Sequence, residues 1–596
     1  MPWVVRFEPG KQPSPVRVLS EPDGEAPIVE RREPCIVVLG GYVETESLPG
    51  DSGGGIAERL ADSYLRTGTG FLQALRGSFA LLLWDERDGR LLALRDPTGS
   101  HPLFYREEEE AVAFSPSPDA VAGVPRKVDR LTAAAHVLSV PAPIERTFYI
   151  DVKRLPPGHV LERESRSTLV RRYWTPRSPG QVASGDDTLE AFQEVLHRAI
   201  RRCLRFSPLA VYLSGGLDSG AIATAAVQVC AQQQVERPLA LLTFFRGTSA
   251  DEERVQRTVV QALDLPFVGG TPEELLDGQG LLREAIALAR RTRDVPPQLI
   301  EPLYDRLAGM ARTIGCRGIL SGMGGDDWLL PNPFHAAERL VALDVAGVLR
   351  LAKAWRVYWP DFGVRDSLAH LVWPYGVRPL LRRPAVLAIE RLLPGHLQKR
   401  RYQMARRALP AWIPDGELRD ELSAIVSERP LSVPIRDLPF ESKLRLLENP
   451  TQSLMQEDLY TAGERTGMRV LAPLLDPDVV SFLLSVDPGR LVAAGRGKAF
   501  AAELAGAAVT DFGSDWPSTV YGDSVWTTTV AAEAAEWHAI GGLEVLNSLG
   551  VVDQAKLAKG LNPPGGETLD AREAVSLARA MTLDVWLRTR ILSQSD

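Results

Sequence analysis

Short apolar runs separated by turns fill the first part of the chain, at residues 35–39, 79–84, 90–94, 102–105 and 111–114. The runs are rich in β-branched and aromatic residues, as strands commonly are. Asp88-Gly89 and Thr98-Gly99 interrupt them, and such dipeptides are typical of tight turns between antiparallel strands. The pattern therefore predicts a β-rich first domain built from antiparallel hairpins.

A different pattern begins near Leu209, where short apolar strands alternate with helices. We expect strands at residues 209–213, 239–245 and 318–321, and helices after Asp218 and over residues 251–263. Such alternation is typical of a doubly wound parallel sheet, which binds ligands at the carboxyl ends of its strands. The predicted fold class is therefore α+β for the first domain and α/β for the second.

The boundary between these two parts is expected in the polar, turn-rich residues 178–187, because an amphipathic helix over residues 189–204 follows them. We accordingly predict one domain over residues 1–180 and a second over residues 181–596. Residues 334–447 of the second domain read as a mostly helical addition that is rich in arginine.

Composition narrows the function classes without naming one. The 596 residues are 45% apolar and 24% charged, which is ordinary for a globular protein, and the formal net charge is -8. We expect no nucleic-acid partner, because phosphate binding requires a basic excess. No run of about 18 apolar residues and no signal-peptide pattern occurs, so we expect no membrane contact and a cytoplasmic location. The four cysteines are far apart, which predicts buried thiols and no zinc site.

The strongest chemical signal is a glycine turn between an expected strand and an expected helix. We assign ATP binding to its members, which are Leu213, Ser214, Gly215, Gly216, Leu217, Asp218 and Ser219. Backbone N–H groups of such a turn and of the helix N-terminus surround one small volume, which suits pyrophosphate. The turn lacks the lysine of a γ-phosphoryl-transferring P-loop. The alternative interpretation is a structural turn capped by Asp218 or Ser219.

A second glycine turn follows the expected strand at residues 318–321. We assign Ser321, Gly322 and Gly324 to ATP binding, and we predict that Asp326 and Asp218 hold a Mg²⁺ ion, since carboxylates are hard ligands that this ion prefers. A turn of this composition on its own is often only a helix N-cap.

Together the two turns resemble the synthetase domain of the asparagine synthetase family, which includes β-lactam synthetases and lasso-peptide isopeptide-forming cyclases. Residues 79–85 (FALLLWD) and 94–105 (LRDPTGSHPLFY) are similar to the glutaminase-like, Ntn-type sandwich domain of that family. Residues 155–159, 472–476 and 495–498 match later elements in the same order. The resemblance implies a sandwich followed by an ATP-pyrophosphatase (PP-loop) domain, with ATP and Mg²⁺ as cofactors.

Departures from the family pattern decide which member is expected. A working glutaminase of this family carries cysteine directly after the initiator, and this chain has Pro2, which has no thiol to attack glutamine. We therefore expect no glutaminase activity and a degenerate first domain. An amine already present on the substrate would then take the place of ammonia, which favours ring closure.

The leading hypothesis is a lasso-peptide macrolactam cyclase, an ATP-dependent carbon–nitrogen ligase that forms AMP and pyrophosphate. The arginine- and tryptophan-rich region 334–447 is the expected surface for a precursor peptide, although it is equally readable as an ordinary helical subdomain. The alternatives are a β-lactam synthetase-like enzyme, an ammonia-dependent asparagine synthetase, and an inactive binding scaffold. The resemblance to cyclases also implies a leader-binding protein and a leader peptidase as partners.

The expected catalytic residues are Lys498, Asp218 and Asp326. Lys498 is the candidate cation that stabilises negative charge in the transition state, and a solvated surface lysine is the alternative. Family members carry another lysine in the following stretch, and residues 517–524 contain none.

Overall fold

The computed structural model describes residues 2–8, 15–19, 26–44, 46, 48, 54–164, 167–176, 188–294, 296–355, 363–381, 391–393, 395–427, 437–493, 496–509, 523–561 and 570–591. The domain boundary expected between residues 180 and 181 lies outside these ranges, as do Gly495 and residues 517–522. No helix in the described ranges has the length and apolar character needed to cross a membrane.

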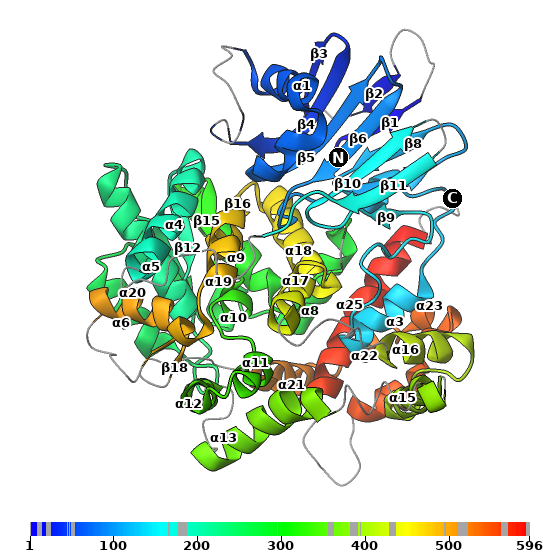
Figure 1. Ribbon diagram of the computed structural model, residues 1–596. Coiled ribbons are helices and arrows are strands. Elements are labelled where there is room, and N and C mark those ends of the chain that lie inside the picture. Colours follow the sequence, from blue (N-terminus) through cyan, green and yellow to red (C-terminus); the bar gives the residue numbers. More distant parts are fainter. Residues whose placement is uncertain are drawn as a thin grey trace.

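The first part of the chain folds into two facing antiparallel sheets (Figure 1, blue to cyan). One sheet has the order β2-β1-β8-β7-β9 and the other the order β11-β10-β6-β5-β4-β3. The strands are β1 (Val4–Phe7), β2 (Val16–Leu19), β3 (Ile28–Arg32), β4 (Cys35–Val43), β5 (Gly77–Asp85), β6 (Arg90–Arg95), β7 (Phe104–Glu107), β8 (Val112–Ser115), β9 (Lys153–Arg154), β10 (His159–Glu164) and β11 (Ser167–Arg172).

Alternating residues of the long strands explain why this unit is a sandwich. Val38 and Leu82 point into the core between the sheets, with Trp3 and Phe114 from the facing sheet. Their neighbours, such as Leu81, face the other way and pack in the cluster that contains helix α1 (Ile56–Thr67). Both faces of β4 and β5 are therefore buried, which is why these strands are nearly continuous apolar runs.

The structure corrects one of the expected hairpins. Asp88-Gly89 does join the paired strands β5 and β6, but Thr98-Gly99 joins β6 to β7, and these two strands belong to different sheets. Asp96 fixes this crossing, because its carboxylate accepts backbone N–H groups from Thr98, Gly99 and His101 at 2.7 to 3.2 Å. The glycine turn thus changes sheets and does not close a hairpin.

The second part contains the predicted parallel sheet, with the order β14-β13-β12-β15-β16. Its strands are β12 (Leu209–Tyr212), β13 (Leu239–Thr243), β14 (Phe267–Gly270), β15 (Gly318–Leu320) and β16 (Arg469–Leu471). The chain leaves β12 toward β13 and later returns to β15 on the opposite side. The carboxyl ends of β12 and β15 therefore flank the topological switch point, where ligands bind in doubly wound sheets.

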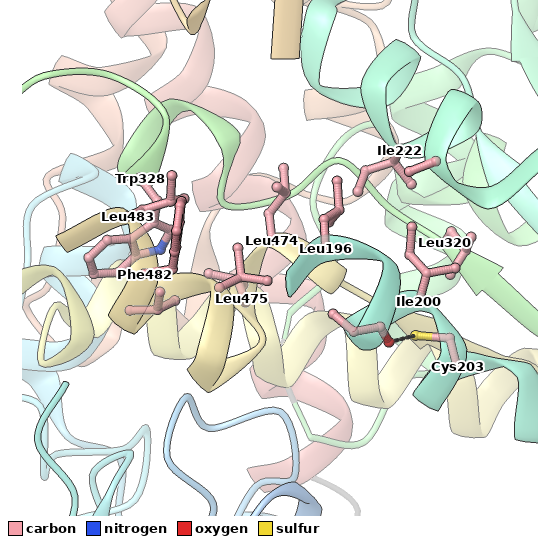
Figure 2. Close-up of a cluster of buried hydrophobic side chains, with 14 of the residues drawn as sticks. Leu196, Ile200, Cys203, Ile222, Leu320, Trp328, Leu474, Leu475, Phe482 and Leu483 are labelled. Atoms are coloured by element: carbon pink, nitrogen blue, oxygen red, sulfur yellow. Dashed lines mark hydrogen bonds between the residues drawn. The ribbon is translucent and has the colours of Figure 1, made fainter. Parts of the chain in front are cut away.

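Helices cover both faces of this sheet. Val211 faces a core shared with α4 (Thr188–Cys203), α5 (Leu217–Gln232), α19 (Pro477–Ser485) and α20 (Ala499–Ala508). Ala210 faces the opposite core, shared with α8 (Leu281–Arg291), α9 (Glu301–Ile314) and α25 (Ala571–Ile591). Figure 2 shows part of the first core, in which Leu196 and Ile200 of α4 lie near Ile222 of α5 and Leu320.

The remaining described elements are mostly helices. They include α2 (Pro118–Val121), α3 (Arg130–Leu138), α6 (Glu253–Ala262), α7 (Pro272–Leu275), α10 (Gly325–Trp328), α11 (His335–Val341), α12 (Val345–Trp355), α13 (Val364–Leu371), the π-helical turn η5 (Val372–Val377), α15 (His396–Ala408), α16 (Glu417–Ser427), α17 (Leu438–Leu447), α18 (Pro450–Thr466), α21 (Asp523–Ala532), α22 (Glu536–Ala539), α23 (Glu544–Ser548) and α24 (Gln554–Leu557). Strands β17 (Val492–Ala493) and β18 (Arg496–Gly497) form a small hairpin. In Figure 1, α11 to α13 lie apart from α15 and α16.

A buried ion-paired cluster joins the sandwich to α18. Arg154 donates from Nε and Nη2 to the two carboxylate oxygens of Glu457, at 2.6 and 3.0 Å. Arg95 adds a contact of 3.3 Å to the same carboxylate, and the three side chains are at most 5% exposed. The carboxylate and both guanidinium groups therefore depend on each other for charge compensation.

Candidate active site

The first glycine turn joins β12 to α5, as the sequence predicts, and its two serines hold it in shape. The hydroxyl of Ser214 accepts the N–H of Gly216 at 3.3 Å and lies 2.9 Å from the hydroxyl of Ser219. Ser219 in turn donates to the carbonyl of Gly216 at 3.1 Å. Gly215 has φ +85°, a conformation that favours glycine. The turn leads directly into the first N–H groups of α5, where helices commonly bind phosphate.

The second glycine turn joins β15 to α10 and presses against the first. A Cβ atom on Gly322 would lie 2.9 Å from the backbone nitrogen of Ser219. A Cβ atom on Gly325 would lie 2.1 to 2.5 Å from the carboxyl atoms of Asp218. Gly324 has φ +92° at the start of α10. The glycines of this turn are therefore required by close packing and by backbone conformation.

The structure brings the three expected catalytic residues together from three separate elements. The ammonium of Lys498 lies 2.7 Å from Oδ2 of Asp218 and 2.7 Å from Oδ1 of Asp326. Lys498 is 3% exposed and adopts φ +59° directly before α20. The predicted alternative of a solvated surface lysine is wrong, because this side chain is buried between two carboxylates.

Charge and burial act against each other at this cluster. Burial raises the pKa of Asp218 to about 6, although the neighbouring ammonium of Lys498 acts to lower it. Burial acts to lower the pKa of Lys498, but Asp218 and Asp326 outweigh it, so the pKa lies above its ordinary value. The ammonium is therefore charged at neutral pH.

The carboxylates of Asp218 and Asp326 fit the expected Mg²⁺. Oδ1 of Asp218 is buried and has no hydrogen-bond partner in the described structure, while Asp326 is 66% exposed. No group of three or more acidic, histidine or cysteine side chains suited to a metal occurs within the described ranges. One or two carboxylates nevertheless suffice for Mg²⁺ when phosphates and water complete its coordination. Asp218 and Asp326 would hold this ion, and its chemistry would be to neutralise triphosphate charge.

Four residues that the sequence interpretation missed support the two turns. Gln256 donates from Nε2 to the carbonyls of Leu213 and Thr243 at 3.1 and 3.2 Å, which ties the ends of β12 and β13 together. Glu252 lies against the first turn, since a Cβ atom on Gly215 would be 3.3 Å from its carboxyl carbon.

On the other side of the site, Lys443 and Gln452 hold α10. Lys443 donates to the carbonyls of Asp327 and Leu330, and Gln452 donates from Nε2 to Asp327 at 2.5 Å. These contacts join residues more than 100 positions apart in the sequence, so no local sequence pattern predicts them.

A small cavity remains between the sandwich and the second part of the chain. Its volume is about 90 Å³, and Gly41, Ser78, His101 and Tyr460 are among its lining residues. Beside it the indole of Trp3 packs against Gly40 and lies 6.3 Å from the His101 ring. The cysteines Cys35, Cys203, Cys230 and Cys316 are all buried, as the sequence predicts. Cys203 also lines the cavity, but its thiol donates to the carbonyl of Ala199 and burial raises its pKa, so it is not activated as a nucleophile.

The doubly wound sheet, its lysine-free glycine turn at the switch point and the carboxylates beside it have the arrangement that the sequence predicted for an ATP-pyrophosphatase domain. A family model described as asparagine synthase matches residues 191–588, about two thirds of the chain. The chain therefore belongs to the asparagine synthase family, whose members are ATP-dependent carbon–nitrogen ligases that make AMP and pyrophosphate. A glutamine amidotransferase domain model matches residues 52–174. These matches confirm the family and the fold class predicted from the sequence.

Curated relatives match over shorter segments. Asparagine synthetase [glutamine-hydrolyzing] 3 of Bacillus subtilis is 32% identical over 171 residues, which are 28% of this chain and 28% of that protein. Amidase chry2 of Gibberella zeae is 28% identical over 303 residues, which are 44% of this chain and 41% of that protein. The chain thus spans well under half the length of these relatives in the aligned segments.

Proposed function

We propose that this protein activates a carboxylate with ATP and joins it to an amine of the same substrate, and that the substrate is a peptide closed into a macrolactam, as in lasso-peptide cyclases. A carboxylate oxygen attacks the α-phosphorus of ATP, the bond to the bridging β-phosphate oxygen breaks, and pyrophosphate leaves. The amine then attacks the acyl carbon, loses a proton and displaces AMP. Lys498 stabilises the negative charge in both steps.

Ring closure by an amine of the substrate is supported by the low reactivity of the thiols in this chain. Glutamine hydrolysis in this family requires a nucleophilic thiol, and burial raises the pKa of all four thiols of the chain. A substrate that carries its own amine needs no ammonia from the sandwich. Holding both reacting groups in one bound molecule also supplies the orientation that makes closure competitive with hydrolysis.

The observation that carries the choice of a peptide is an exposed apolar surface around α12, a helix that packs on the hairpin before Lys498. Val341 ends α11, Leu343 lies in the following turn, and Val345 and Leu349 belong to α12. These four residues are 62%, 85%, 67% and 41% exposed, respectively. We call these four residues the apolar ridge. Helix α12 packs beside the β17–β18 hairpin, which leads into Lys498. Clustered exposed apolar side chains are typical of binding surfaces for large partners.

The arginines expected to hold the peptide divide between two places. Arg350 is exposed on α12 beside the ridge, whereas Arg400 and Arg401 lie on α15, which Figure 1 places apart from α10. Trp412 is 7% exposed and belongs to the core, while Trp373 is 59% exposed. Arg356, Arg382, Arg383 and Trp359 lie outside the described residues. We therefore assign peptide contact to the ridge and Arg350, and not to Arg400 and Arg401.

A leader-binding protein, a leader peptidase and a cytoplasmic setting belong to this proposal as well. The experiment that tests it measures substrate-dependent exchange of labelled pyrophosphate into ATP with Mg²⁺, first with precursor peptides and then with free amino acids. A peptide product lighter by one water, with its N-terminal amine blocked, would support the cyclase. A dehydrated amino acid would instead favour the β-lactam synthetase-like alternative, ammonia-dependent asparagine formation would favour the third, and no exchange with any substrate would favour an inactive scaffold.

A further inference from the structure

A second polar cavity lies away from the nucleotide turns, where the sandwich part meets α18 and α25. Its volume is about 150 Å³, and its wall includes Thr132 and His136 of α3, Asp458 of α18 and Arg579 of α25. A water molecule occupies about 30 Å³ in the liquid, so the cavity has room for a ligand of several heavy atoms. Nothing in the reaction proposed above uses this cavity.

Four buried polar atoms around the cavity have no hydrogen-bond partner in the described structure. They are Thr132 Oγ1, His136 Nε2, Asp458 Oδ1 and Arg579 Nε. Buried polar groups are nearly always hydrogen-bonded, because a buried group without a partner loses its interaction with water and gains nothing in exchange. Four of them around one cavity make it a candidate site for a polar ligand.

The charges in the wall point to the chemistry of that molecule. Arg146 is paired with Asp129 at 2.6 Å, and Arg154 is paired with Glu457. Among the described residues, Asp458 and Arg579 are the charged groups of the wall that take part in no ion pair, since Asp458 contacts Gln298 and Arg579 donates to the His136 carbonyl. One acidic and one basic side chain therefore remain available.

We propose that this cavity binds the zwitterionic head of a free α-amino acid, with the carboxylate on Arg579 and the ammonium on Asp458. A guanidinium binds a carboxylate through charge-assisted hydrogen bonds, and a carboxylate does the same for an ammonium. The inference goes beyond the proposed function, because it holds whichever substrate the nucleotide site uses.

The electrostatics of the cavity wall agree with this assignment. Burial raises the pKa of the Asp458 carboxyl well above its usual range and lowers the pKa of the Arg579 guanidinium. Burial also lowers the pKa of His136 to about 3, so its ring is neutral and offers a nitrogen to the ligand. Asp458 and Arg579 already attract each other electrostatically without forming a direct ion pair, and a bound ammonium and carboxylate would give each of them a contacting partner of opposite charge.

Helix α18 also connects the cavity to the active site. Asp458 lies on α18, and Gln452 of the same helix donates to Asp327 in α10, next to Asp326. Arg154 and Glu457 tie this helix to the sandwich as well. A ligand that orders α18 would therefore bear on the turn that carries Asp326, which makes the site suitable for an effector.

The test is direct binding to the full chain without ATP or Mg²⁺, so its outcome is independent of the proposed reaction. Each of the twenty common L-amino acids is added at up to 10 mM, on the order of a weak effector's working range, and the unfolding temperature and heat of binding are recorded. We expect at least one amino acid to bind saturably and to raise the unfolding temperature, because a ligand that binds only the folded state stabilises it.

Two sets of controls decide the chemistry. The amide of the best amino acid lacks the carboxylate and its N-acetyl derivative lacks the ammonium, so both should bind at least ~10-fold more weakly, as the loss of one charge-assisted hydrogen bond requires. Asp458→Asn and Arg579→Met should lose binding, whereas Arg572→Met, an exposed position on the same helix, should retain it. Asp458→Asn is nearly isosteric and remains informative if Arg579→Met fails to fold.

Three results would overturn the proposal: no saturable binding of any amino acid, equal binding of the amide or N-acetyl derivative, or unchanged binding by a folded Asp458→Asn protein. The first would mean that water alone fills the cavity.

Discussion

Lys498 and Asp218 lie 280 residues apart in the sequence, and their Nζ and Oδ2 atoms are separated by 2.7 Å. Asp218 belongs to the first turn of α5, and Lys498 directly precedes α20, so the contact joins the nucleotide turn to a distant helix. The same ammonium also contacts Asp326. One lysine thus sets the spacing between two carboxylates that would otherwise repel each other.

Replacing Lys498 with Met should lower pyrophosphate exchange by at least ~10²-fold, the range seen when one electrostatic catalytic element is removed. The variant should also unfold at a lower temperature, because Asp218 and Asp326 would face each other without the cation. Lys399→Met, at an exposed position on α15, is the matched control and should change neither quantity. Normal exchange by a folded Lys498→Met protein would remove this residue from the site.

Asp218→Asn and Asp326→Asn should each abolish pyrophosphate exchange or raise the Mg²⁺ concentration that it requires. The two substitutions should differ in stability, because the Asp218 side chain is 17% exposed and that of Asp326 is 66% exposed. We expect a lower unfolding temperature mainly for Asp218→Asn. Titration of exchange against Mg²⁺ checks the prediction, and an unaltered Mg²⁺ dependence in both variants would contradict it.

Gly325→Ala should disable the site through a single methyl group. Its Cβ atom would lie 2.1 to 2.5 Å from the carboxyl atoms of Asp218, so either the carboxylate or the second turn must move. Gly309→Ala is the control, since a Cβ atom there has open space within α9 and alanine is favoured in a helix. ATP binding and exchange should fall for Gly325→Ala alone, and equal activity of the two variants would show that the turns tolerate the displacement.

ATP affinity should weaken as the pH rises through about 7. Burial raises the pKa of Glu252 to about 7, and this side chain lies against Gly215 of the nucleotide turn. Below that pH the carboxyl is protonated and neutral, whereas above it the negative charge repels the phosphates of ATP. Glu252→Gln should remove this pH dependence and keep ATP affinity high at pH 8. An identical pH profile in wild type and variant would contradict the assignment.

Substitutions in the apolar ridge should impair peptide use more than ATP use. Leu343→Asp is expected to raise the peptide concentration needed for half-maximal exchange by at least ~10-fold, since the loss of a central apolar contact commonly costs more than 1 kcal/mol. Val124→Asp, at a position that is 79% exposed on the sandwich, is the control. Equal effects of the two substitutions would argue that the ridge does not contact the peptide.

The sequence predicts the placement of the two glycine turns because parallel strands β12 and β15 each end in one, and their carboxyl ends meet at the switch point. It does not predict β14 or β16, which span four and three residues and carry too little pattern to be recognised. The prediction of a hairpin at Thr98-Gly99 is wrong for a related reason. A glycine turn between two apolar runs has the same local composition whether the strands pair or enter different sheets.

Strand and turn patterns in the sequence do not identify the residues that support the site. Gln256, Lys443 and Gln452 are polar residues within helices, and only folding brings them to the carbonyls and carboxylate that they bind. Glu252 could have been identified from the sequence. It follows Asp251 and directly precedes the helix after β13, close to the expected nucleotide site. Strand and helix order alone would have made it a candidate.

Because Arg154 pairs with Glu457, loss of the sandwich during evolution would destabilise the rest of the protein. A shortened chain without the sandwich would leave the Glu457 carboxylate without either guanidinium. Breaking a buried pair by removing one partner costs about 3–5 kcal/mol, a large part of the stability of a typical domain. A protein whose reaction no longer uses ammonia would therefore still keep the sandwich, because the sandwich stabilises the rest of the fold.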